Sequence, residues 1–167
     1  MLDSRALSAY LNNHLVVLTG TVELCRRAAS NQPEPGAARE LGELAAEVDS
    51  DRATLKGLLR TLGVPENRLM SLAGVVGERL GRFKPNGYLV AHSPASDLVE
   101  LEGLRTAVAH KIALWQVLRA VAAHDDRLGR VELERLIERA QAQADRLYAL
   151  HLRVAEAYLR SPADEPG

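Results

Sequence analysis

Long stretches with apolar residues at every third or fourth position run through this sequence, separated by short clusters of proline, glycine and polar residues. This spacing places the apolar side chains on one face of an α-helix, and the intervening clusters are typical of turns and loops. The pattern predicts helices over residues 5–30, 36–62, 66–82, 94–123 and 127–160. Each long segment then needs a partner against which it can bury its apolar face.

The composition favours helices over strands. Leucine and alanine are frequent, and aromatic residues make up only 4% of the chain, a mixture that suits helix formation. Four amphipathic helices of similar length bury their apolar faces most simply as a bundle. We therefore expect an all-α four-helix bundle with a short extra helix, 66–82, between its second and third long helices. We expect residues 1–160 to form one helical-bundle domain and 161–167 to be a disordered polar tail.

The connection between the second and third long helices allows two topologies. A helix of ~17 residues rises about 25 Å, enough to run the height of a bundle. If segment 66–82 does so, the next long helix runs parallel to the second, which is the crossover connectivity of ferritin-like bundles. If the segment only caps one end, the bundle is an up-down meander. We favour the crossover.

Charge and composition argue against several partners. The formal net charge is −1, so no strong field attracts nucleic acid or an anionic membrane. No segment approaches the ~20 uninterrupted apolar residues of a membrane span, and the first residues lack the apolar run of a signal peptide. The single cysteine, Cys25, cannot form an intramolecular disulfide, which fits a reducing compartment. We therefore expect a cytoplasmic protein that binds neither nucleic acid nor a membrane.

Four ionisable residues face or border the predicted core. His14 and His151 fall near the centres of the apolar faces of the first and last long helices, while Asp51 and Glu100 border those of the second and third. In a meander these four residues lie at one level of the bundle. Such a layer of two imidazoles and two carboxylates has the chemistry of a metal site.

The crossover topology groups these residues differently. The first histidine and Asp51 then share a level with Lys111, while His151 moves toward Glu100 and Glu40. This arrangement indicates buried hydrogen bonds and ion pairs, which in bundles commonly fix register and partner choice. We favour this structural interpretation over a metal site.

Locally spaced ligand motifs are missing from the sequence. A di-iron carboxylate bundle needs Glu-x-x-His on two helices, and this pattern occurs nowhere in the chain. His-x-x-x-His, His-Glu-x-x-His, a cysteine pair and a glycine-rich phosphate loop are missing too. We therefore expect no catalytic residue, no cofactor and no metal; the alternative, a metal site at His14, Asp51, Glu100 and His151, requires the meander.

The predicted helix 94–123 is apolar nearly all round. Its main stripe contains Leu98, Leu101, Leu104, Val108, Ile112, Trp115 and Ala122. The opposite side carries Ala109, Ala113, Val117 and Ala120. A helix of this kind is covered on both sides, and its second cover is either the helix 66–82 or another copy of the protein. The same helix has a polar strip, Glu102, Thr106 and His110, which we interpret as a solvated or interfacial face.

Three pieces of the chain carry a resemblance to known sequences. They are YLNNHLVVLTGTVEL (10–24), GERLGRFKPNGYL (77–89) and SPASDLVELEGL (93–104). In these pieces the chain resembles a family of uncharacterised helical proteins from high-GC bacteria, with the similarity extending over nearly the whole chain. The resemblance implies a helical-bundle fold and no particular activity. The chain is also similar to ferritin-like bundles in architecture, without their di-iron ligands.

These observations lead to two functional hypotheses. The first is a non-enzymatic cytosolic bundle that forms a homodimer, or binds a protein partner, through helix 94–123, because that helix has a second, alanine-rich face. The alternative is a metal-binding or small-molecule-binding bundle that uses its inward histidines and carboxylates.

Overall fold

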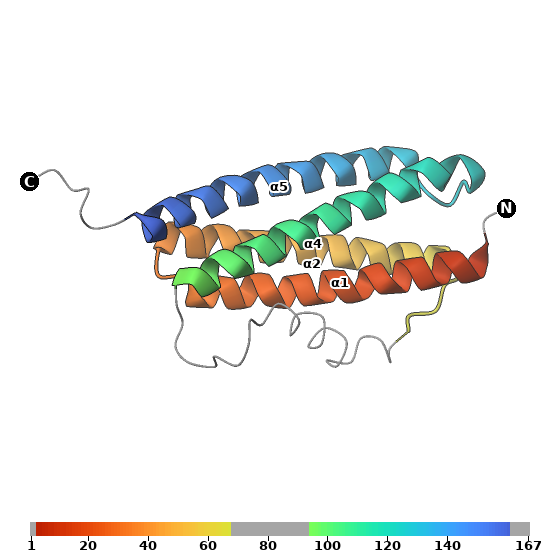
Figure 1. The fold of residues 1–167 in the computed structure, drawn as a ribbon. Coiled ribbons are helices and arrows are strands. Elements are labelled where there is room, and N and C mark those ends of the chain that lie inside the picture. Colours follow the sequence, from red (N-terminus) through yellow and green to blue (C-terminus); the bar gives the residue numbers. More distant parts are fainter. Residues whose placement is uncertain (1–2, 68–93, 161–167) are drawn as a thin grey trace, which may run out of the picture.

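The computed structural model describes residues 3–67 and 94–160. These ranges contain the long helices α1 (Ser4–Asn31), α2 (Pro35–Thr61), α4 (Pro94–Val121) and α5 (Arg130–Leu159). A short 3₁₀ turn, η1 (Ala122–His124), lies between the last two (Figure 1). No strand occurs in these ranges. The predicted all-α, four-helix architecture is therefore confirmed.

Capping residues account for where α1 and α2 begin, and a glycine follows the end of α2. The Asp3 carboxylate caps α1 by accepting hydrogen bonds from two backbone N–H groups of the first turn, at 2.9 and 3.1 Å. Glu34 caps α2 in the same way, and Pro35 occupies the first helical position, where its missing N–H is not needed. After α2, Gly63 has φ +72°, a conformation that glycine adopts without strain.

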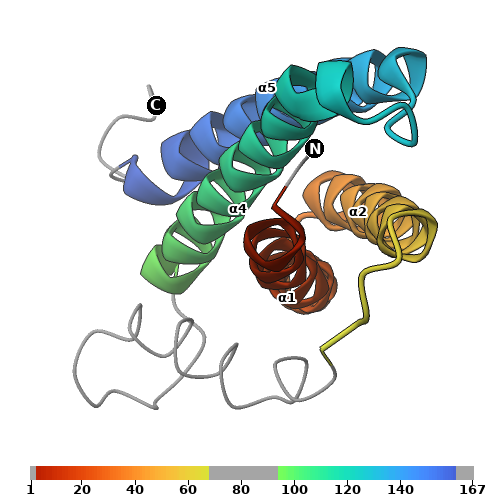
Figure 2. The ribbon, with the colours of Figure 1, turned by 90° about the vertical axis from the view of Figure 1, so that its right-hand side faces the viewer.

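The four helices form two antiparallel hairpins, α1 with α2 and α4 with α5, which pack together mainly through α1 and α4. Figure 2 shows α1 against α4, whereas α2 and α5 stand farther apart. At one end of the bundle the Tyr158 hydroxyl donates to Asp97 (2.9 Å) and lies 3.3 Å from Gln32 Oε1. The end of α5 therefore meets the start of α4 and the α1–α2 turn. It follows that α4 runs in the same direction as α2 (Figure 1).

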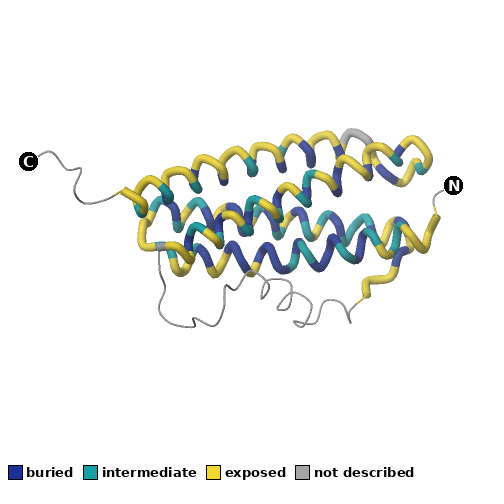
Figure 3. The backbone as a smooth tube through the Cα atoms, in the orientation of Figure 1, coloured by how far each residue is buried: buried dark blue, intermediate teal, exposed yellow. Residues whose placement is uncertain are grey.

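The core consists mostly of leucine, valine and alanine side chains from all four helices. Figure 3 shows that buried positions follow the inner sides of the helices and are densest along α1. Fully buried members include Leu11, Leu18, Leu41, Leu55, Leu59, Leu101, Leu104, Leu114, Trp115 and Leu118. Apart from Leu114 and Leu118, which the predicted stripe of helix 94–123 did not include, these residues belong to the apolar stripes visible in the sequence. Burial of the stripes holds the bundle together.

A buried asparagine fixes where the chain goes after α2. The Asn12 side chain of α1 donates to the Pro65 carbonyl oxygen (3.1 Å) and accepts from the Asn67 backbone N–H (2.7 Å). Because Asn12 is only 4% exposed, this contact holds residues 65–67 directly against α1.

The helix bounds agree with the predicted ones to within a few residues, except that the predicted helix 94–123 finishes in a 3₁₀ turn and α5 begins at Arg130. The predicted short helix 66–82 falls almost entirely outside the described residues, and so does the predicted tail 161–167. Within the described ranges no helix has a stretch long and apolar enough to cross a lipid bilayer.

Candidate functional site

A buried polar network lies between α2, α4 and α5. At its centre Lys111 Nζ donates to Asp51 Oδ2 (2.6 Å) and to the side-chain oxygen of Gln143. Arg139 donates to the other Asp51 oxygen, and Gln143 Nε2 donates to Glu47 Oε2 (2.8 Å). Asp51, Lys111 and Gln143 are at most 1% exposed. The network thus joins three helices through one carboxylate and one ammonium group.

Ion pairs continue this network along the surface between α2 and α5. Arg146 donates to Glu47 (2.5 Å), and Arg153 donates to Glu40 (2.6 Å). Arg139, Arg146 and Arg153 follow each other at seven-residue intervals and therefore lie on one side of α5. Long arginine side chains bridge the wider separation of α2 and α5 that Figure 2 shows.

Burial dominates the electrostatics of the network. It lowers the pKa of Lys111, although the neighbouring Asp51 carboxylate opposes the shift. Cys25 is fully buried, and burial raises the pKa of its thiol to about 12, against a smaller opposing effect of Lys111. A thiol with so high a pKa is protonated at neutral pH and is a poor nucleophile. We interpret the network as structural, because its charged groups bind one another.

A second cluster joins α1 and α4 through aromatic and imidazole rings. The His14 ring centre lies 4.5 Å from that of Tyr10 and 4.1 Å from that of His110, both in edge-to-face geometry. His14 is 3% exposed, and His110 is intermediate. Burial, with a smaller contribution from the facing His110 imidazole, lowers the His14 pKa to about 4. The His14 ring is therefore neutral at neutral pH.

His110 contacts a neighbouring helix, contrary to the prediction. We interpreted the strip that contains it as a solvated or interfacial face, but its ring packs against His14 of α1. Thr106 and Glu102, by contrast, are exposed.

His151 lies in a groove of about 680 Å³ between α4 and α5. Arg105 Nη1 lies 2.9 Å from His151 Nδ1. The other ring nitrogen, His151 Nε2, lies 3.9 Å from Glu102 Oε1. Because a guanidinium group can only donate, Nδ1 acts as the acceptor. The Arg105 guanidinium also stacks over Tyr148, 4.8 Å from the ring centre. The remaining lining residues are Thr106, Ala109, Ala144 and Asp145.

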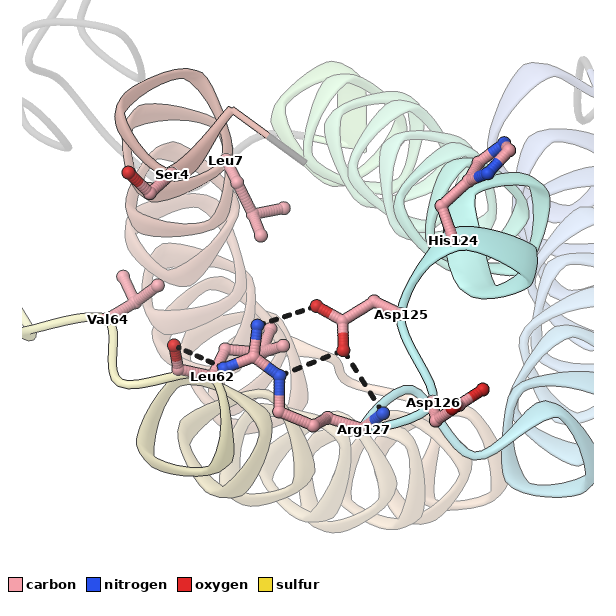
Figure 4. A pocket seen from close by; sticks show the side chains of 8 residues that line it. All are labelled: Ser4, Leu7, Leu62, Val64, His124, Asp125, Asp126 and Arg127. Atoms are coloured by element: carbon pink, nitrogen blue, oxygen red, sulfur yellow. Dashed lines mark hydrogen bonds and ion pairs between the residues drawn. The ribbon is translucent and has the colours of Figure 1, made fainter. Parts of the chain in front are cut away.

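A pocket of about 460 Å³ opens at the opposite end of the bundle from Tyr158. Figure 4 shows Leu7 and Val64 at its wall and the Asp125–Arg127 pair at its centre. Arg127 binds both oxygens of Asp125, at 2.6 and 2.8 Å, and also reaches the Leu62 carbonyl oxygen at 3.3 Å. These bonds with Arg127 lower the Asp125 pKa to about 2. The pair holds the turn before α5 against the end of α2.

The structure does not bring the four predicted site residues together. His14 contacts Tyr10 and His110, Asp51 binds Lys111 and Arg139, and His151 contacts Arg105. Glu100 pairs with Arg27 at 2.9 Å, and its second oxygen is buried without a hydrogen bond. Among the described residues no group of three or more histidine, cysteine, aspartate and glutamate side chains could hold a metal ion.

Sequence reasoning missed three contributors to these clusters. They are Arg139, the second cation on Asp51; His110, the neighbour of His14; and Arg105, which orients His151. The seven-residue spacing of arginines on α5 is a signal that could have indicated the first. The other two depend on how neighbouring helices are rotated against each other, which no local pattern reveals.

In comparisons with known proteins, no family model, no curated sequence and no solved structure matches this chain.

Proposed function

We propose that the protein is a non-enzymatic helical bundle that self-associates through the outer face of α4 and α5. One observation carries this proposal. The large hydrophobic side chains exposed in the described residues all lie on these two helices: Val99, Val117, Tyr148, Leu152 and Leu159. Exposed apolar side chains on two adjacent helices are typical of protein–protein interfaces.

Small residues surround the larger ones on this face. Ala109, Ala113 and Ala120 are exposed on α4, so another helix can approach the α4 backbone closely. These positions belong to the second apolar side of the helix predicted over 94–123. The face is therefore suited to helix-on-helix packing.

A second copy of the chain is the occupant that the charges favour. The groove in this face holds a cation, Arg105, beside the carboxylates of Glu102 and Asp145. A two-fold axis placed between Arg105 and these carboxylates would set the cation of one copy against the carboxylates of the other. The net charge of −1 adds little repulsion between copies. We therefore propose a homodimer in preference to a complex with a different protein.

The proposal includes the topology and location of the bundle. We propose that the chain has the crossover connectivity of ferritin-like bundles, supported by the common direction of α2 and α4 and by the contact of residues 65–67 with α1. A cytoplasmic location is supported by the lone, fully buried cysteine, since such a thiol needs no oxidising compartment. The alternative metal-binding function at His14, Asp51, Glu100 and His151 is disfavoured because these residues lie in separate clusters.

Replacing Ala113 by arginine is expected to weaken self-association. The new side chain places a bulky charge in the middle of the apolar face, and the dissociation constant should rise about tenfold or more, equivalent to about 1.4 kcal/mol. Sedimentation equilibrium over a wide concentration range measures this change.

The matched control is Ala53→Arg, because Ala53 is exposed on α2, away from the proposed face. It should leave the dissociation constant of the wild type unchanged. A wild-type protein that stays monomeric at the highest concentrations, or an equal effect of the two arginines, would refute the proposed dimer.

A further inference from the structure

Two buried N–H groups have no hydrogen-bond acceptor among the described residues: Trp115 Nε1 on α4 and Arg139 Nε on α5. Trp115 is fully buried, and the Arg139 side chain uses a terminal nitrogen of its guanidinium to bind Asp51. Buried polar groups nearly always have a partner, and a tryptophan N–H in a protein core usually finds one. Two unsatisfied donors therefore indicate an acceptor that the described residues do not supply.

Both donors lie at one level of the antiparallel α4–α5 pair. On one side of this level Lys111 binds the side-chain oxygen of Gln143, and on the other side Arg119 pairs with Glu134 at 3.0 Å. The tryptophan lies four residues from each of these α4 positions, and the unsatisfied arginine lies four and five residues from the α5 positions. Because residues four apart lie on the same side of a helix, the two donors share one level and one side of the contact between the helices.

We propose that a halide ion such as chloride binds between α4 and α5 and accepts hydrogen bonds from Trp115 Nε1 and Arg139 Nε. The site lies inside the bundle, since the indole is fully buried, and it is separate from the outer face proposed for self-association. It extends the buried network by one helical turn beyond Lys111, because Trp115 follows Lys111 by four residues. The bound ion ties α4 to α5 at this level.

The neighbouring charges favour an anion over a water molecule. The buried network and the ion pair that continues it have one positive charge in excess: Lys111, Arg139 and Arg146 against Asp51 and Glu47. A buried anion needs such a positive charge beside it, here the guanidinium that also donates to it. Both unsatisfied groups are donors, which suits a halide because it only accepts hydrogen bonds. A water molecule at the same place must also find acceptors for its own two protons.

Titration with sodium bromide, followed by fluorescence, tests the proposal, since Trp115 is the only tryptophan in the chain. Bromide bound at the indole N–H quenches its emission as a heavy atom, and we expect this quenching to saturate. Arg139→Lys keeps a cation for Asp51 but removes the Nε–H, so the half-saturating bromide concentration should rise roughly tenfold or more. Arg146→Lys is the matched control, because Arg146 lies on the same side of α5 and binds Glu47. It should bind bromide as the wild type does.

A second measurement compares melting temperatures in sodium chloride and in sodium gluconate at equal ionic strength, because gluconate is too large for a buried site. A ligand that binds only the folded chain raises its melting temperature. Chloride should therefore raise the melting temperature more in the wild type than in Trp115→Phe, while general salt effects are the same in both. The proposal is overturned if bromide quenching does not saturate or if the two lysine variants bind bromide alike. It is also overturned if the wild type and Trp115→Phe respond alike to the two salts, which would show that no anion binds the indole N–H.

Discussion

Replacing Lys111 by methionine is expected to destabilise the bundle by about 3 kcal/mol, because it leaves a buried carboxylate without its ammonium partner. Asp51 and Lys111 are at most 1% exposed and bind each other at 2.6 Å. Methionine has a similar shape, so little of the loss comes from a cavity. Arg139 also binds Asp51 but is partly exposed, which limits the effect. Urea unfolding followed by circular dichroism measures the change.

Lys56→Met is the matched control for this substitution. Lys56 is 41% exposed and pairs with Glu66 at 3.5 Å. An exposed pair of this kind contributes up to about 1 kcal/mol, so the control should unfold almost like the wild type. Equal losses in the two variants would mean that burial of the Asp51–Lys111 pair has no energetic consequence.

The double variant Asp51→Leu with Lys111→Met separates the cost of an unpaired Asp51 charge from the net contribution of the ion pair. If the loss in Lys111→Met comes from the unpaired Asp51 charge, removing that charge should recover most of the stability. Arg139, which is partly exposed, can then turn toward solvent. A double variant that is less stable than Lys111→Met would show that the pair itself is a strong net contributor.

The helices and their apolar stripes could be predicted from the sequence because both depend on local spacing. Asp3 and Pro35 mark helix starts, and Leu11, Leu55 and Leu104 fall on the stripes and are fully buried. The reasons are local: caps satisfy the first N–H groups, and a period of 3.6 residues gathers apolar side chains on one face.

The partners of the inward polar residues could not all be predicted, since they depend on how helices pack. Asp51 and Lys111 were placed at one level only under the crossover topology, and the structure pairs them. The position of His110 on its own helix suggested solvent, yet α1 brings His14 against it. Tyr148 is 50% exposed in the α4–α5 groove. A single helix gives the direction of a side chain but not the element that covers it.

The buried network explains how this bundle selects one packing arrangement. Leucine and alanine stripes pack in several registers with similar free energy, since apolar contacts are not directional. Lys111 satisfies Asp51 and Gln143 together only at one register of α2, α4 and α5. If one of these helices shifted along another, a buried charge would lose its partner, and the folded state would lose free energy of stabilisation. We therefore expect Lys111→Met to lose register specificity as well as stability.

Lowering the pH from 7 to about 4.5 is expected to remove stability that depends on His14, by about 2 kcal/mol. Burial and the facing His110 ring lower the His14 pKa to about 4, whereas the unfolded chain has a value of roughly 6.5. Between these values the unfolded state binds the proton more readily. The contribution is therefore fully present above about pH 6.5 and is lost as the pH falls toward 4.

His14→Leu isolates this contribution, because leucine fills the site without titrating. Free energies of unfolding measured from pH 4 to 8 should fall less steeply in the variant than in the wild type. The exposed His124, changed to leucine, serves as the control and should keep the wild-type slope. Parallel curves for wild type and His14→Leu would contradict this prediction. They would mean that the His14 pKa is the same in the folded and the unfolded chain, despite its contacts with Tyr10 and His110.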